Sequence, residues 1–104
     1  MRDPGLSVAR GVITDTIRLA ALEVPGVLRV GRSGFRLRQL LGGSPVRAQI
    51  RDGRVHVLLW LVARPQQPLV PLTSQVRGAV AAAVERLLGL ELGDVTVHVD
   101  GVGA

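Results

Sequence analysis

A cluster of arginines is the chemical feature of the chain that stands out first. Arg29, Arg32, Arg36 and Arg38 place four guanidinium groups within ten residues. Guanidinium groups hold phosphate oxygens in bidentate fashion and lie against anionic lipid head groups. A run of charges is also the ordinary composition of a solvated loop. The sequence therefore leaves two interpretations of this cluster open, an anion-binding segment and a loop without a ligand.

The two histidines are the other side chains that could do chemistry. His56 and His98 fall on predicted strands, at positions that point away from the predicted core. If those strands are neighbours, the imidazoles could be close, with Asp100 as a third metal ligand. Zinc sites normally require three or four convergent ligands, so we interpret both histidines as solvated strand residues. The prediction is no metal and no cofactor.

The chain shows no constellation of catalytic residues. The serines fall at predicted turns or helix starts, outside any nucleophile-elbow pattern, and the carboxylates show no paired spacing. The glycines between residues 31 and 43 match no nucleotide-binding fingerprint. The absence of cysteine excludes thiol nucleophiles and disulfides. We therefore predict a non-enzymatic protein with no small-molecule substrate.

Length and composition predict one globular domain over residues 1–104. The chain is 47% hydrophobic with a net charge of +5, and all 13 of its basic residues are arginine. The longest apolar run, Val57 to Ala63, is far shorter than the roughly 20 residues of a membrane-spanning helix. No signal peptide is evident. We expect a cytoplasmic protein whose contact with the inner face of the membrane is peripheral, through a partner.

Apolar residues at helical spacing predict two principal helices. The first is expected over residues 10–24, ended by Pro25-Gly26, with a short strand at Leu6 to Val8 before it. The second begins at Pro71 or Thr73 and ends at Gly89. A short strand at residues 27–30 and a short helix within residues 35–41 are expected between them.

Alternation of apolar and polar residues predicts the remaining strands. Residues 46–51 and 54–64 flank Asp52-Gly53, which is the turn chemistry of a tight hairpin. Residues 95–99 form a closing strand, which a right-handed crossover would place parallel to its neighbour. The predicted fold is α+β in αββαβ order, with a small mixed β-sheet and two principal helices in a single two-layer domain.

The central strand carries apolar residues on both of its faces. His56, Leu58, Trp60 and Val62 lie opposite the predicted core side, beside a polar row on residues 47–51. If both helices cover the other face, these residues form an exposed patch of the kind that marks protein interfaces, anchored by tryptophan. If one helix lies on each face, the strand is simply buried on both sides. The sequence leaves both arrangements open.

Four segments of the chain resemble the alkaline shock protein family of bacterial envelope-stress proteins. They are VARGVITDTIRLAALEVPGV, RDGRVHVLLWLVA, the helix that ends in LLGLEL, and DVTVHVDGV. The similarity runs from about Leu6 to Val102. The resemblance implies a cytoplasmic, non-enzymatic protein tied to cell-envelope homeostasis, which associates with itself and is held at the membrane by a partner protein.

Two functional hypotheses follow. The first is a scaffold protein that forms homo-oligomers and binds an envelope-linked, membrane-anchored partner through the sheet face or the arginine segment. The rival is a small basic RNA-binding or phosphate-binding domain that acts through the arginine cluster. Against nucleic acid, the chain offers only two aromatic residues for base stacking, Phe35 and Trp60. Binding driven by phosphate should fall steeply with salt, whereas scaffold binding should depend on Trp60.

Overall fold

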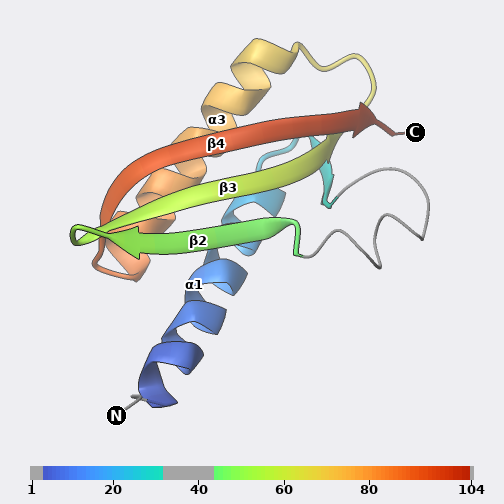
Figure 1. Cartoon of the computed structure of the whole chain (residues 1–104). Coiled ribbons are helices and arrows are strands. Elements are labelled where there is room, and N and C mark those ends of the chain that lie inside the picture. Colours follow the sequence, from blue (N-terminus) through green and yellow to red (C-terminus); the bar gives the residue numbers. More distant parts are fainter. Residues whose placement is uncertain (1–3, 32–43, 104) are drawn as a thin grey trace.

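The computed structural model describes residues 4–31 and 44–103 (Figure 1). It confirms the α+β class, the two principal helices and the small mixed sheet. The helix expected within residues 35–41 lies outside the described residues. The elements, in chain order, are α1 (Pro4–Leu22), β1 (Val27–Val30), β2 (Val46–Arg51), β3 (Arg54–Ala63), α3 (Leu69–Ala82), the π-helical turn η1 (Ala83–Leu87) and β4 (Glu91–Val102).

Strand β3 is the centre of the sheet. Strands β1 and β2 both pair with it antiparallel, whereas β4 pairs with it in parallel over nearly its whole length. The parallel pairing confirms the predicted crossover through the second helix. The turn between β2 and β3 is also as predicted, because Asp52 and Gly53 both take positive φ, 53° and 76°, as a type I′ turn requires.

One edge of β3 is lined by a strand that is interrupted once. The amide of Gly31 donates to the carbonyl of Trp60, and the amide of Trp60 donates to the carbonyl of Pro45, both at 2.9 Å. The chain therefore leaves the edge at Gly31 and rejoins it at Pro45, at the level of the same β3 residue. Strands β1 and β2 are two halves of one edge, which the sequence pattern did not indicate.

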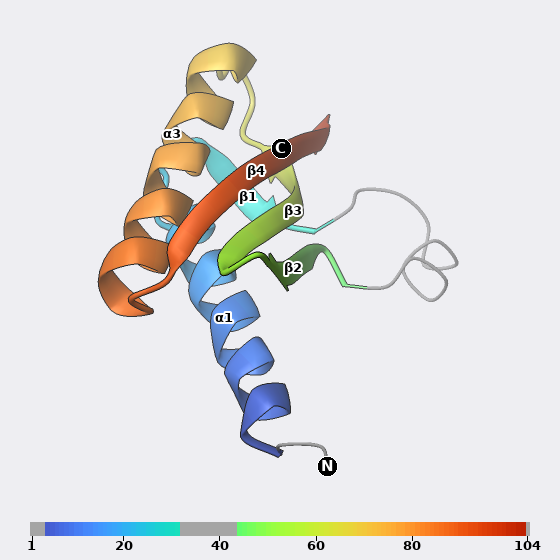
Figure 2. The same cartoon turned by 60° about the vertical axis from the view of Figure 1, so that its left-hand side comes forward.

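Both helices lie on the same face of the sheet (Figures 1 and 2). This settles the arrangement that the sequence left open. One face of each element is buried between the helices and the sheet, and none of the helices in residues 4–31 and 44–103 lies on the other face of the sheet. The largest fully buried side chains of this core are Ile17, Val55, Leu59, Leu61, Leu72, Val76, Val80 and Val84.

The helix boundaries differ from those predicted. Helix α1 begins at Pro4, so residues 6–8 are helical and the predicted strand there is wrong. Proline suits the first turn of a helix, where its missing donor has no partner to lose. Helix α3 likewise begins before Pro71, at Leu69. Gly89 follows the end of η1, which continues from α3, and its φ of 66° confirms the predicted terminating glycine. No helix in the described ranges is both long and apolar enough to span a membrane.

Candidate interaction surface

The face of the sheet turned away from the helices is the candidate site, and we call it the open face. Directly paired residues on neighbouring strands share a face, so the register fixes its members. They form three rows, one per strand. The rows are Arg47, Gln49 and Arg51 on β2; Arg54, His56, Leu58 and Trp60 on β3; and Glu91, Asp94, Thr96, His98 and Asp100 on β4.

Trp60 and Leu58 form the apolar centre of the open face, and both side chains are half-buried. The indole of Trp60 stacks on the imidazole of His98, which is its register partner on β4. The ring centroids are 5.2 Å apart and the planes differ by 19°. The stacking fixes a broad aromatic surface in one orientation, so less side-chain entropy is lost when a partner covers it.

Val62 was expected in the exposed patch, but the structure shows it buried. Its side chain is 1% exposed, even though it follows Trp60 on the same side of β3. A Cβ placed on Gly103 would meet the side chains of Leu28 and Val62, so β1 and the end of β4 close over this valine. Val62 therefore lies on the open-face side of β3 but is covered by neighbouring side chains, and it offers no surface to a partner.

A bulge in β4 positions His56. Val55 pairs with Leu92 and Val57 with Val95, so Gly93 and Asp94 both lie opposite His56. The imidazole lies over Gly93, where an added Cβ would come within 2.6 Å of Cε1. Its Nδ1 makes a short hydrogen bond with the carboxylate of Asp94. That bond lowers the pKa of Asp94, and the positive charge of nearby Arg51 contributes in the same direction.

The two histidines do not come together as a metal site would require. His98 stacks on Trp60, whereas His56 pairs with Asp94. Within the part of the chain that the structure describes, no group of three or more His, Cys, Asp or Glu side chains could hold a metal ion.

A shallow hollow of about 260 Å³ lies beside His56 on the open face. Arg47, Gln49 and Arg51 form its β2 wall, and Asp94 and Thr96 form its β4 wall. Arg47 and Arg51 are exposed and make no ion pair with any residue described here, whereas Arg54 donates to Glu91 at 3.2 Å. These two arginines were noted in the sequence only as a flank of the patch. The register shows that they lie on the same face as the carboxylates of β4, on the opposite side of β3.

The predicted arginine cluster is described only in part. Arg29 is exposed on β1, paired in register with Val62. Arg32, Arg36 and Arg38 lie outside the described residues. The structure places Arg29 on the same sheet edge as Arg47 and Arg51, because β1 and β2 line one side of β3.

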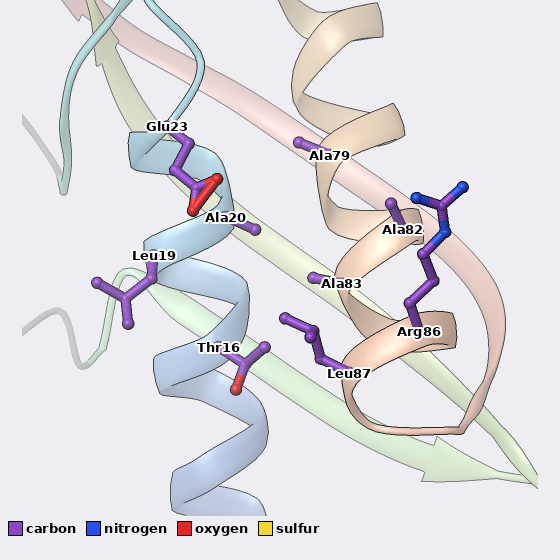
Figure 3. A pocket seen from close by; sticks show the side chains of 9 residues that line it. All are labelled: Thr16, Leu19, Ala20, Glu23, Ala79, Ala82, Ala83, Arg86 and Leu87. Atoms are coloured by element: carbon purple, nitrogen blue, oxygen red, sulfur yellow. The ribbon is translucent and has the colours of Figure 1, made fainter.

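A second surface lies on the helix side and was not predicted. A groove of about 430 Å³ runs between α1 and the end of α3 with η1 (Figure 3). Alanines floor it, and Leu19 and Leu87 stand at its rim, 57% and 76% exposed. Their positions off the buried stripes of the two helices were the only signal in the sequence. Among the described residues that line the groove, two are charged, Glu23 on one wall and Arg86 on the other.

A family model described as having a cell envelope-related function matches residues 3–104. The chain belongs to the alkaline shock protein 23 family. This confirms the resemblance carried by the four sequence segments. No curated protein sequence matches this member of the family.

Solved structures similar to this family member include several forms of the MamM CTD. One substituted form is 21% identical, with 88% of this chain and 95% of that chain covered and a TM-score of 0.56. The copper form is 19% identical, with 90% and 87% covered and a TM-score of 0.57. At this level of identity the likeness supports the shared α+β fold and nothing more.

Proposed function

We propose that this member of the alkaline shock protein 23 family is a non-enzymatic interaction module. It associates with itself and binds an envelope-linked protein, and its binding surface is the open face. The observation that carries the proposal is the placement of both α1 and α3 on one side of the sheet (Figure 2). The register places Trp60 and Leu58 on the other side, away from these two helices.

The composition of the open face supports a protein partner. Interfaces bind mainly through a few central residues, among which tryptophan is enriched, within a surrounding polar rim. Trp60 and Leu58 supply such a centre, and the rows on β2 and β4 supply the rim. The stacking of Trp60 on His98 prepares the anchor before a partner arrives.

The family's cell envelope-related function supports the place of action. We place the protein at the inner face of the membrane, held there by a membrane-anchored partner. Several of the similar MamM CTD structures are named as copper, zinc or nickel forms. The proposal for this chain includes no metal, because His56 and His98 are engaged by different neighbours on the open face.

The rival function is binding of RNA or another phosphate ligand through arginine. The exposed Arg29, Arg47 and Arg51 on one sheet edge favour it, together with the net charge of +5. Binding of that kind would weaken steeply with salt, because each neutralised phosphate releases counterions.

Size-exclusion chromatography with light scattering, at low and high salt, tests the proposal. Wild type is expected to form a dimer or larger assembly that persists in high salt. Trp60→Ala should raise its dissociation constant by about thirtyfold, the effect of losing about 2 kcal/mol at an interface anchor. Leu87→Ala is the matched control, because it removes an exposed apolar side chain from the helix side. Equal association of Trp60→Ala and wild type would contradict the proposal.

A further inference from the structure

The charges of the open face are divided between its two outer strands. The β2 row carries Arg47 and Arg51, and exposed Arg29 extends the same edge on β1. The β4 row carries three carboxylates, those of Glu91, Asp94 and Asp100. The face is thus positive along one side and negative along the other, with Leu58 and Trp60 between them.

The ion pairs among the described residues leave this division of charge in place. Arg54 and His56, both on β3, bond to Glu91 and Asp94 respectively. These carboxylates keep 65% and 69% of their side-chain surface exposed, so they can accept further hydrogen bonds. Arg47 and Arg51 have no ion-pair partner among the described residues. The unpaired cations lie on the opposite side of β3 from the carboxylates.

We propose that the open face is self-complementary and that its occupant is a second copy of this chain. A two-fold axis parallel to β3 lays β2 of one copy over β4 of its partner when the faces pack together. Each arginine row then faces a carboxylate row, twice per dimer, and the two Trp60 side chains meet near the axis. Sheets packed in this way lie with their strands within about 30° of one another.

The charges also select this arrangement over the other two-fold packing. An axis in the interface but perpendicular to β3 would place β2 over β2 in the reverse direction, so that the arginine row of one copy faces the arginine row of the other. Opposed like charges disfavour that orientation, whereas opposite charges favour the parallel one. The apolar centre contributes affinity in either orientation, so the charged rows of β2 and β4 affect the orientation of the two copies more than the affinity of the dimer.

The inference rests on the proposed function, because it assigns a partner to the same open face. Its test is complementation between two charge-reversal variants. The first, Arg47→Glu with Arg51→Glu, makes the β2 row negative. The second, Glu91→Arg with Asp94→Arg, makes the β4 row positive. Circular dichroism first establishes that each variant is folded, and a mass tag on one variant identifies mixed dimers by native mass spectrometry.

Each variant alone should associate at least about tenfold more weakly than wild type, because like charges face each other at both contacts between β2 and β4 in its dimer. An equimolar mixture should recover wild-type association almost entirely as heterodimers, in which all facing rows are again opposite. Arg18→Glu with Arg86→Glu is the control for the first variant, because it makes the same change in net charge on the helix side. That variant should associate as wild type does.

Three results would overturn the inference, and they separate it from the proposed function. If the charge variants associate normally while Trp60→Ala does not, the open face is the interface but the rows do not pair. If Trp60→Ala also associates normally, the open face is not the interface and both proposals fail. If wild type is monomeric at its highest soluble concentration, a second copy is not the occupant, and only a different protein partner remains for the face.

Discussion

At the scale of single residues, the bulge in β4 determines which side chains lie beside His56 on the open face. Gly93 and Asp94 both lie opposite His56 because β4 has one more residue than β3 at this bulge. The glycine leaves room for the imidazole, and the aspartate binds it. The sequence indicated that His56 and His98 share a face, which is correct. It did not indicate the bulge, since alternation of residue types does not show where a ladder gains a residue.

The hydrogen bond between His56 and Asp94 makes stability depend on acid pH. The pKa of Asp94 in the folded chain lies below its ordinary value of 3.8. The ionised carboxylate therefore stabilises the fold above that value, and this contribution is lost as the pH falls below 3.8 through the lowered pKa. Asp94→Asn should remove that part of the pH dependence. Urea denaturation at a series of pH values measures it.

His56→Gln provides the partner test for this pair. Without the imidazole, the largest cause of the lowered pKa of Asp94 is gone. The variant should therefore show the same flattened dependence below pH 3.8 as Asp94→Asn. A slope equal to that of wild type in both variants would show that the bond contributes nothing to stability.

At the scale of elements, the turn from α1 into β1 shows how closely the parts are fitted. The carbonyl of Gly26 accepts from the amide of Arg64, at 2.9 Å, and the carbonyl of Pro25 accepts from its Nε, at 3.1 Å. An added Cβ on Gly26 would lie 2.6 Å from Oε1 of Gln67 and 2.7 Å from Cδ1 of Leu72. The Pro-Gly pair thus ends the helix and also permits the loop before α3 to pack against it.

A matched pair of glycine substitutions tests that fit. Gly26→Ala should lower the free energy of unfolding by about 1–3 kcal/mol, as overpacking against buried Leu72 requires a shift of neighbours. Gly78→Ala, in α3 with open space around it, should raise the same quantity by about 0.5–1 kcal/mol. Chemical denaturation gives both values. If Gly26→Ala did not lower the free energy of unfolding, the close contacts of Gly26 with Gln67 and Leu72 would not constrain the fold.

The elements that the sequence predicted well are those with a local signal. The hairpin follows from Asp52-Gly53 and the alternation on both sides, and the end of α3 follows from Gly89. The start of α1 was misplaced because Gly11, a weak helix former, lies near the predicted start, whereas Pro4 is well suited to the first turn. The division of one edge into β1 and β2 depends on pairing between distant residues, for which no local pattern exists.

At the scale of the whole molecule, one core joins every described element. Ile17 from α1, Leu61 from β3 and Val80 from α3 are fully buried in the same cluster. The open face takes no part in it, so core and interface are separated by the thickness of one sheet. The sequence identified both faces of β3 but could not determine which one the helices cover, because β3 is apolar on each.

A substitution in this core should unfold helices and sheet together. Leu61→Ala is expected to cost about 2–5 kcal/mol, since the side chain is completely buried. Circular dichroism reports mainly on the helices, and the fluorescence of Trp60 reports on the sheet. In a two-state protein both transitions shift to the same lower denaturant midpoint. Two separate midpoints would show that the helix layer melts independently of the sheet.

The interruption of the sheet edge at Trp60 has a consequence for how this domain can vary. Gly31 and Pro45 are held by the carbonyl and the amide of one residue, Trp60, so the sheet fixes the two points at which the chain leaves the edge and rejoins it. The entropy of closing a loop rises slowly with length, by about 0.6 kcal/mol for each doubling. At this junction one sequence can therefore be exchanged for another without disturbing the backbone hydrogen bonds between β3 and its neighbours. A segment inserted there begins and ends beside Trp60, so its sequence can change next to the open face while the core stays the same.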